Sequence, residues 1–128
     1  MTPAAIAAIA LCVILGVLAV LQFALILGAP LGHFAWGGAD RVLPRGKRIG
    51  SAVSILLYAV FAWVFLMRAG LMPLVLPEIV VDVATWVIVG YFVLGIPLNA
   101  ISRSKPERYT MTPMLVVLLA LALVVALS

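Results

Sequence analysis

Four long apolar runs without a charged side chain constrain the fold of this chain more than any other feature. They lie at residues 4–27, 49–67, 83–98 and 114–127. A helix rises 1.5 Å per residue, so about 18 apolar residues match the hydrocarbon thickness of a bilayer. With flanking residues included, we expect membrane-spanning helices at about 4–27, 49–67, 79–98 and 112–127.

The composition argues against a water-soluble domain. The chain has 128 residues, of which 67% are hydrophobic and 9% are charged, whereas soluble domains are about half apolar and about a quarter charged. Backbone N–H and C=O groups find no water partner in lipid, so each span must be a helix. The predicted fold class is an all-α four-helix transmembrane bundle, forming a single domain over residues 1–128.

A short motif occurs twice, at the expected ends of the first and third spans. Its copies are Leu27-Gly28-Ala29-Pro30-Leu31 and Leu94-Gly95-Ile96-Pro97-Leu98. One interpretation is a duplication that produced two related helical hairpins, as in transporters built from parallel repeats. The other is coincidence, because glycine and proline recur wherever helices end. The sequence leaves both interpretations open.

The basic residues are distributed unevenly among the connections between spans. The second connection contains Arg68 alone, whereas the first and third contain Arg41, Arg45, Lys47, Arg48, Arg103, Lys105 and Arg108. The first and third connections of a four-span protein lie on the same side of the membrane. The positive-inside rule therefore predicts that both are cytoplasmic and that both termini are outside. The lipid bilayer, with anionic headgroups at the basic loops, is the expected partner. No nucleic acid is needed to explain these cations.

Two loop segments resemble those of a known family. The first segment contains Gly28-Ala29-Pro30, Gly32, Ala35-Trp36-Gly37-Gly38, Leu43-Pro44, Arg48 and Ser51. The second contains Asn99, Ser102-Arg103-Ser104, Glu107-Arg108 and Pro113. Together they resemble a family of small uncharacterised bacterial four-helix integral membrane proteins, which has no established activity. The resemblance implies a multi-pass protein of the bacterial plasma (inner) membrane and nothing about its chemistry.

Asp82 and Thr85 form one candidate ion or proton site. Asp82 follows Glu78 by four residues at the start of the third span, and Thr85 lies about one turn deeper. An ionisable group at membrane depth is costly and usually functional. A carboxylate near a helix N-terminus is alternatively stabilised by the helix dipole. The choice depends on whether Asp82 lies within the membrane, so both interpretations stay open.

Gln22 and Tyr58 complete the predicted substrate or ion path. Tyr58 belongs to a small, weakly polar ridge on the second span, formed by Gly50, Ser54, Tyr58 and Ala62. Such a ridge is first a packing surface for a neighbouring helix, and lines a path only by extension. We expect four helices to enclose very little space, so a path would lie between the protomers of a homo-oligomer.

The loop from Gly28 to Gly38 is unusually apolar and rich in glycine, and it contains His33 and Trp36. One interpretation is a segment that folds back toward the membrane and approaches a ligand. The other is an interfacial turn in which Trp36 anchors at headgroup depth. Candidate loop or lipid-binding residues are His33, Trp36, Arg48, Asn99 and Arg103.

The sequence contains no set of nucleophile, base and orienting group, no phosphate-binding glycine loop and no metal-ligand spacing. We therefore predict no catalytic residue, metal or cofactor, and an enzyme is the less favoured class. The first functional hypothesis is a homo-oligomeric transporter or channel for a small solute or ion. The alternatives are a lipid-binding or small-hydrophobe-binding protein, and an accessory subunit of a larger membrane complex.

Overall fold

The computed structural model describes residues 1–128 and consists of four long helices with no strand. The helices are α1 (Pro3–Ile26), α2 (Arg45–Arg68), α3 (Glu78–Ala100) and α4 (Lys105–Ala126). Two short 3₁₀ turns, η1 (Gly32–Phe34) and η2 (Trp36–Gly38), lie between α1 and α2. Each long helix is long and apolar enough to cross a membrane. The all-α four-helix transmembrane bundle predicted from the sequence is confirmed.

Local capping interactions fix both ends of α1. The Thr2 hydroxyl accepts a hydrogen bond from the Ala5 N–H at 3.1 Å, and Pro3 occupies the first turn, where its missing N–H is no loss. At the other end Gly28 has a φ of 91°. Its N–H bonds to the carbonyl of Leu25, and the next N–H bonds to that of Ala24. This pair of bonds is a Schellman cap.

The two copies of the L-G-x-P-L motif adopt different structures. The first copy ends α1, as expected. The second copy was expected to end the third span, and it lies within the last two turns of α3, which ends two residues beyond it at Ala100. The motif therefore does not mark a structural element that the two hairpins share.

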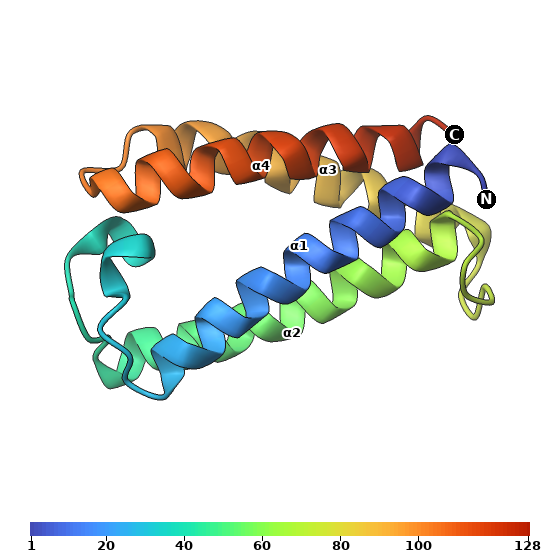
Figure 1. Ribbon diagram of the computed structural model, residues 1–128. Helices are drawn as coiled ribbons and strands as arrows, with labels where there is room; N and C mark the ends of the chain where they lie inside the picture. The colour runs from blue at the N-terminus through green and yellow to red at the C-terminus, as the bar shows by residue number, and fades with distance from the viewer.

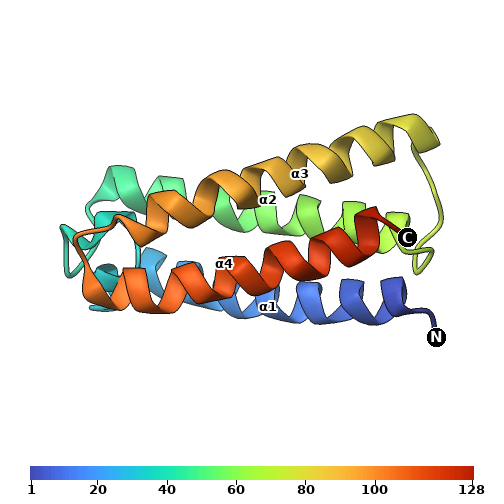
Figure 2. The same ribbon diagram turned by 90° about the horizontal axis from the view of Figure 1, so that it is seen from above.

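The helices form two hairpins, α1–α2 and α3–α4, which lie one over the other (Figure 2). The hairpins converge at one end and diverge at the other (Figure 1). Both termini and the connection 69–77 lie at the converging end, here called the terminal end. The segments 27–44 and 101–104 lie at the diverging end, here called the loop end. Helix α1 packs against α2 and α4, and α3 packs against α4 and α2, which closes the bundle.

The size of the packed side chains explains why the hairpins converge. At the terminal end, α1 buries Ala4 and Ala8 while α4 buries Ala122 and Ala126. Alanines allow helix backbones to approach closely in lipid. Toward the loop end the same two helices present larger side chains, among them Leu15, Leu18, Met111, Met114 and Leu115.

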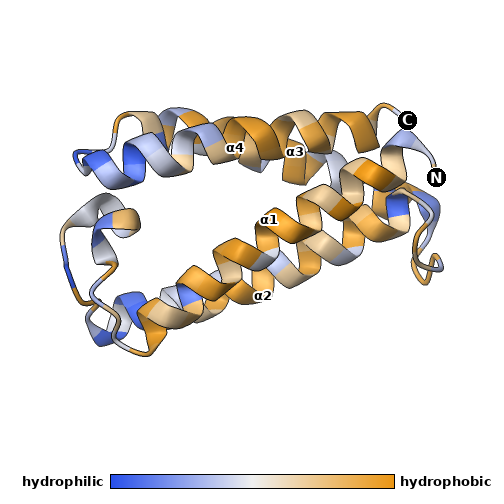
Figure 3. Ribbon diagram, viewed as in Figure 1, coloured by the Kyte–Doolittle hydropathy of each residue, from blue (hydrophilic) through white to orange (hydrophobic).

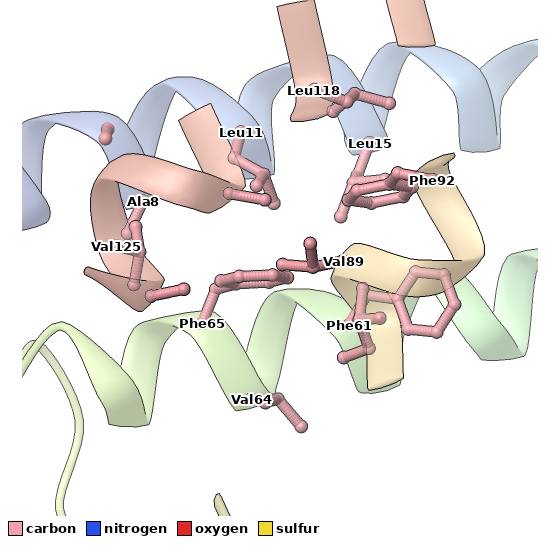
Figure 4. Packing of buried hydrophobic residues seen from close by; sticks show 14 of the residues in the cluster. Ala8, Leu11, Leu15, Phe61, Val64, Phe65, Val89, Phe92, Leu118 and Val125 are labelled. Carbon is pink, nitrogen blue, oxygen red and sulfur yellow. The ribbon is translucent and has the colours of Figure 1, made fainter. Parts of the chain in front are cut away.

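A single hydrophobic core joins all four helices (Figure 4). Each helix contributes a large, fully buried side chain to it: Leu11 of α1, Phe65 of α2, Phe92 of α3 and Leu118 of α4. Phe61 contacts Phe92 edge to face, with ring centroids 5.9 Å apart. The outer faces are also apolar along the middle of the bundle, and hydrophilic residues gather at its ends (Figure 3). This distribution fits helices surrounded by lipid.

Candidate binding cavity

A cavity of about 450 Å³ lies between the two hairpins toward the loop end. This volume is within the range of small-molecule sites. The expectation that four helices enclose very little space is therefore wrong, and a single chain provides a cavity without a second protomer. Most of its lining is apolar, and the polar side chains among the lining residues are Gln22, Trp36, Ser54, Tyr58, Tyr91, Asn99 and Glu107.

The cavity is polar at one end and apolar at the other. Leu15, Phe92 and Leu118, which belong to the hydrophobic core, line its deep end. Trp36 and Glu107 line it near the loop end. The lining also includes Tyr91, Leu94 and Leu98 of α3, which are 51%, 67% and 66% exposed. The cavity therefore reaches the outer surface of the bundle beside α3.

Gln22 and Tyr58, which the sequence placed together on one path, meet in this cavity. The Gln22 amide nitrogen donates a hydrogen bond to the Tyr58 hydroxyl at 3.4 Å. The amide oxygen of Gln22 is buried and has no hydrogen-bond partner. A buried acceptor without a donor costs free energy in the absence of a ligand. This end of α1 therefore presents an unsatisfied polar group within the bundle.

The loop before α2 folds back against the bundle and supplies Trp36 to the cavity lining. The Trp36 indole N–H donates to the Ser51 hydroxyl at 3.2 Å, and Ser51 is fully buried. The indole ring lies directly against Gly50, where a β-carbon would overlap it. Trp36 also has a φ of 54°, a conformation that non-glycine residues rarely adopt and that costs free energy. The ridge residue Gly50 thus accommodates the indole, while Ser54 and Tyr58 line the cavity.

Two further contacts hold the loop in place. The Gly32 N–H bonds to the Arg41 carbonyl at 2.8 Å, and a β-carbon on Gly32 would overlap the backbone of Asp40. On the other side, the Ser104 hydroxyl at the start of α4 donates to the His33 carbonyl. The first loop is therefore tied to the other hairpin at the loop end.

Glu107 is a cavity residue that the sequence reasoning did not select. Its side chain is buried, with a residue exposure of 9%, and the Ser102 hydroxyl donates to its carboxylate at 3.2 Å. Neither ion pair of the protein involves Glu107. The available signal was Ser104-Lys105-Pro106-Glu107, which matches the S-x-x-E pattern of a helix capping box. That pattern favours a structural role for the glutamate.

A second, open pocket of about 500 Å³ lies at the loop end, between the first loop and the start of α4. His33, Arg103 and Lys105 contribute its basic side chains. The His33 ring nitrogen Nδ1 lies 3.2 Å from the Gly38 carbonyl. The predicted loop residues His33 and Arg103 therefore lie together, in a position that water or lipid headgroups can reach.

Arg48 and Asn99 have intramolecular partners. The Arg48 guanidinium donates to the carbonyls of Leu43 at 2.7 Å and Ile26 at 3.5 Å. It thus places a cation at the C-terminus of α1, where the helix dipole favours one. The Asn99 amide donates to the Gly95 carbonyl at 2.8 Å within α3, and Asn99 also lines the cavity.

Asp82 and Thr85 lie apart from Gln22 and Tyr58, toward the terminal end. Asp82 pairs with Arg68, with 3.2 Å between Oδ1 and Nε. Thr85 is buried, and its hydroxyl donates to the Val81 carbonyl at 2.8 Å. Neither residue lines the cavity. The four residues predicted to line one path thus fall into two separate groups.

No protein-family model, curated protein or solved structure shows significant similarity to this chain. The resemblance noted from the loop segments therefore gains no support, and the function has to be argued from the cavity itself.

Proposed function

We propose that this small multi-pass membrane protein binds a small amphipathic molecule in the cavity between its hairpins. The supporting observation is the shape and polarity of the cavity. It is apolar at Leu15, Phe92 and Leu118 and polar at Trp36 and Glu107. A ligand with an apolar body and a polar end would match both regions.

The position of the cavity indicates how such a ligand enters. Its lining continues onto the exposed faces of Tyr91, Leu94 and Leu98. An amphiphile dissolved in the bilayer therefore reaches the cavity from the side, beside α3, without crossing water. Its polar end then lies at the loop end, near the membrane surface, because the basic connections lie there.

Energy transfer from tryptophan to a neutral dansyl amide probe tests this proposal. The chain has three tryptophans, so Trp63→Phe and Trp86→Phe leave Trp36 as the single donor in the cavity lining. In lipid nanodiscs, the probe should give saturable dansyl emission on tryptophan excitation. Saturation at one probe per chain is the expected result, whereas emission that rises linearly with probe concentration indicates simple partition into lipid and contradicts the proposal.

A matched pair of substitutions locates the binding. Ser54→Phe places a ring in the cavity, since Ser54 lines it. Val53→Phe introduces the same ring one residue earlier, where the side chain is 51% exposed and lies outside the cavity lining. Binding should be lost in the first variant and retained in the second. Equal binding by both variants would show that the probe binds outside this cavity.

Transport is a second candidate function, favoured by the arrangement of the hairpins. They converge at the terminal end and diverge at the loop end, with the cavity between them (Figure 1). Rocking of one hairpin against the other would expose such a cavity to each side in turn. A homo-oligomer, the form first expected for a transporter, is compatible with this mechanism but is not required by it.

A distance measurement tests the rocking motion. Spin labels at Phe23→Cys in α1 and Tyr109→Cys in α4, in a Cys12→Ala background, lie on exposed side chains near the loop end. A rocking transporter should give two distance populations whose ratio changes when the probe is added. A single distance population that does not change when the probe is added would contradict the transport proposal and leave the binding proposal standing.

A further inference from the structure

The charge of the cavity indicates the chemical class of its ligand. Among the lining residues Glu107 alone has a carboxyl group, and none has a basic side chain. A carboxylate taken out of water requires a partner of opposite charge or several hydrogen-bond donors. Glu107 has the Ser102 hydroxyl at 3.2 Å as its side-chain partner. Its pairing is therefore incomplete.

Helix capping does not account for the burial of Glu107. In a capping box the Ser104 hydroxyl would accept from the Glu107 N–H, and the Glu107 carboxylate would accept from the Ser104 N–H. In this protein the Ser104 hydroxyl donates to the His33 carbonyl. The Ser104 N–H bonds to the Ser102 hydroxyl at 3.2 Å instead of the carboxylate. Both side-chain hydrogen bonds of a capping box are therefore absent.

Ion pairs with neighbouring cations do not account for the burial of Glu107 either. Lys47 pairs with Asp40 and Arg68 pairs with Asp82. Arg108, the residue next to Glu107, lies over the Tyr109 ring, 4.8 Å from its centroid. The carboxylate thus lies at the cavity without any of the protein's own cations as a partner.

Gln22 provides a second, independent sign that the cavity binds a polar group. Its amide oxygen is buried without a partner, and Gln22 lines the same cavity. The other buried side-chain atom without a partner, the Thr112 hydroxyl, lies outside the cavity lining. Tyr58 is the one hydrogen-bond partner of the Gln22 side chain, so either orientation of the amide leaves one polar atom unpaired.

We propose that the ligand is an amphipathic ammonium compound whose N–H groups bond to Glu107 and whose apolar part extends toward Leu118. This inference rests on the proposed function and names its ligand class. An ammonium group supplies the missing opposite charge together with several donors. The aromatic rings of Trp36, Tyr58 and Tyr91, which also line the cavity, attract cations through their faces. A cavity lined by one carboxylate and several aromatic rings fits a cation better than an anion or a neutral polar group.

Two dansyl probes that differ in one group test the inference. Dansylcadaverine has a free primary amine, and its N-acetyl derivative has the same fluorophore and chain without the charge. Both are titrated into the protein in phosphatidylglycerol nanodiscs, with Trp36 as the donor as described above. The bulk partition of each probe is subtracted with empty nanodiscs of the same composition. The amine should bind about tenfold more tightly than the acetylated probe, or better.

Substitution of the carboxylate supplies the decisive comparison. Glu107→Gln keeps the size of the side chain and removes its charge, so the preference for the amine should disappear. Glu107→Asp should retain part of it. Glu78→Gln is the matched control, because Glu78 is an exposed carboxylate at the terminal end, outside the cavity. That variant should keep the full preference.

The outcomes separate this inference from the proposed function. If both probes bind saturably with equal affinity to the wild type and to Glu107→Gln, the ammonium inference is overturned and the cavity function stands. If neither probe binds saturably to the wild type, both proposals fail. An ammonium group comes from a free organic amine or from a lipid headgroup. Competition by added phosphatidylethanolamine would identify the lipid as its source, and the absence of competition would identify a free amine.

Discussion

Arg68, the last residue of α2, joins the second, third and fourth helices at the terminal end. Its Nε lies 3.2 Å from Oδ1 of Asp82 on α3. A second guanidinium nitrogen donates to the carbonyls of Ala126 at 3.2 Å and Ser128 at 2.9 Å, at the end of α4. The cation thus neutralises a carboxylate near the start of one helix and bonds to the free carbonyls at the end of another.

Arg68 should therefore contribute more to stability than Asp82. The Asp82 side chain is 42% exposed, so Asp82→Asn should lower the free energy of unfolding by about 1 kcal/mol or less. Arg68→Gln removes the cation from the ion pair and from both carbonyls, and should cost about 1–3 kcal/mol. Unfolding in mixed micelles by increasing SDS, followed by circular dichroism, measures both values. An equal cost for the two variants would contradict the role assigned to the C-terminal carbonyls.

Gly50 should be required for the position of Trp36. Gly50→Ala places a methyl group against the indole ring and should cost about 1–3 kcal/mol or displace the ring. Gly46→Ala is the control, because no neighbouring atom lies within 4 Å of its added carbon. That variant should be neutral or slightly stabilising, since alanine favours a helix over glycine. Trp36 emission, with Trp63 and Trp86 replaced by phenylalanine, should change in the first variant and not in the second.

The helices were predictable from the sequence because their signal is long and simple. Apolar runs without charge fix both the number of spans and their approximate limits. The helical extension at the start of α2 was not predicted, because residues from Arg45 onward are basic and lie outside the apolar run. The expected third span, 79–98, already included Pro97, and α3 continues only two residues further, to Ala100. Proline usually ends a helix, but its lost hydrogen bond is tolerated in the last turn of this one.

The cavity was only partly predictable. Gln22 was selected as a strongly polar residue in an apolar span and Tyr58 as part of the weakly polar ridge on the second span, and both signals are local. The convergence of the hairpins depends on which alanines face one another across α1 and α4, and one sequence does not reveal that pairing. Glu107 was not selected, and its local pattern, that of a capping box, gives no sign of a cavity. The Ser104 hydroxyl donates instead to the carbonyl of His33, which is 71 residues away in the sequence.

Leu118 should be among the most important packing residues of α4. It is 1% exposed and belongs to the hydrophobic core (Figure 4). It also lines the deep end of the cavity. Leu118→Ala should lower stability by about 2–5 kcal/mol through lost van der Waals contacts. Val117→Ala changes a neighbouring side chain that is 48% exposed toward lipid, and should cost well under about 1 kcal/mol. The same SDS titration compares them, and similar losses would place Leu118 outside the packed core.

The membrane orientation remains a prediction from the basic loops and can be tested directly. Single cysteines at Arg41 and Arg103, in a Cys12→Ala background, should both be protected from an impermeant maleimide added outside intact cells. A cysteine at Leu74, in the connection between α2 and α3, should react. Reaction at both basic loops, with protection at Leu74, would reverse the assigned orientation while leaving the fold unchanged.

The loop that supplies Trp36 should lose its protection from hydrogen exchange when its contact with α4 is removed. Ser104→Ala removes the hydroxyl that donates to the His33 carbonyl. The N–H groups of Ala35 and Gly38, which bond within the two 3₁₀ turns, should then exchange faster, since these short turns depend on tertiary contacts. Ser128→Ala is the control, because that hydroxyl bonds to Val124 at the terminal end. Unchanged exchange in Ser104→Ala would show that the contacts of Gly32 with Arg41 and of Trp36 with α2 hold the loop without Ser104. Gly32→Ala, which forces a β-carbon against the Asp40 backbone, should then release it.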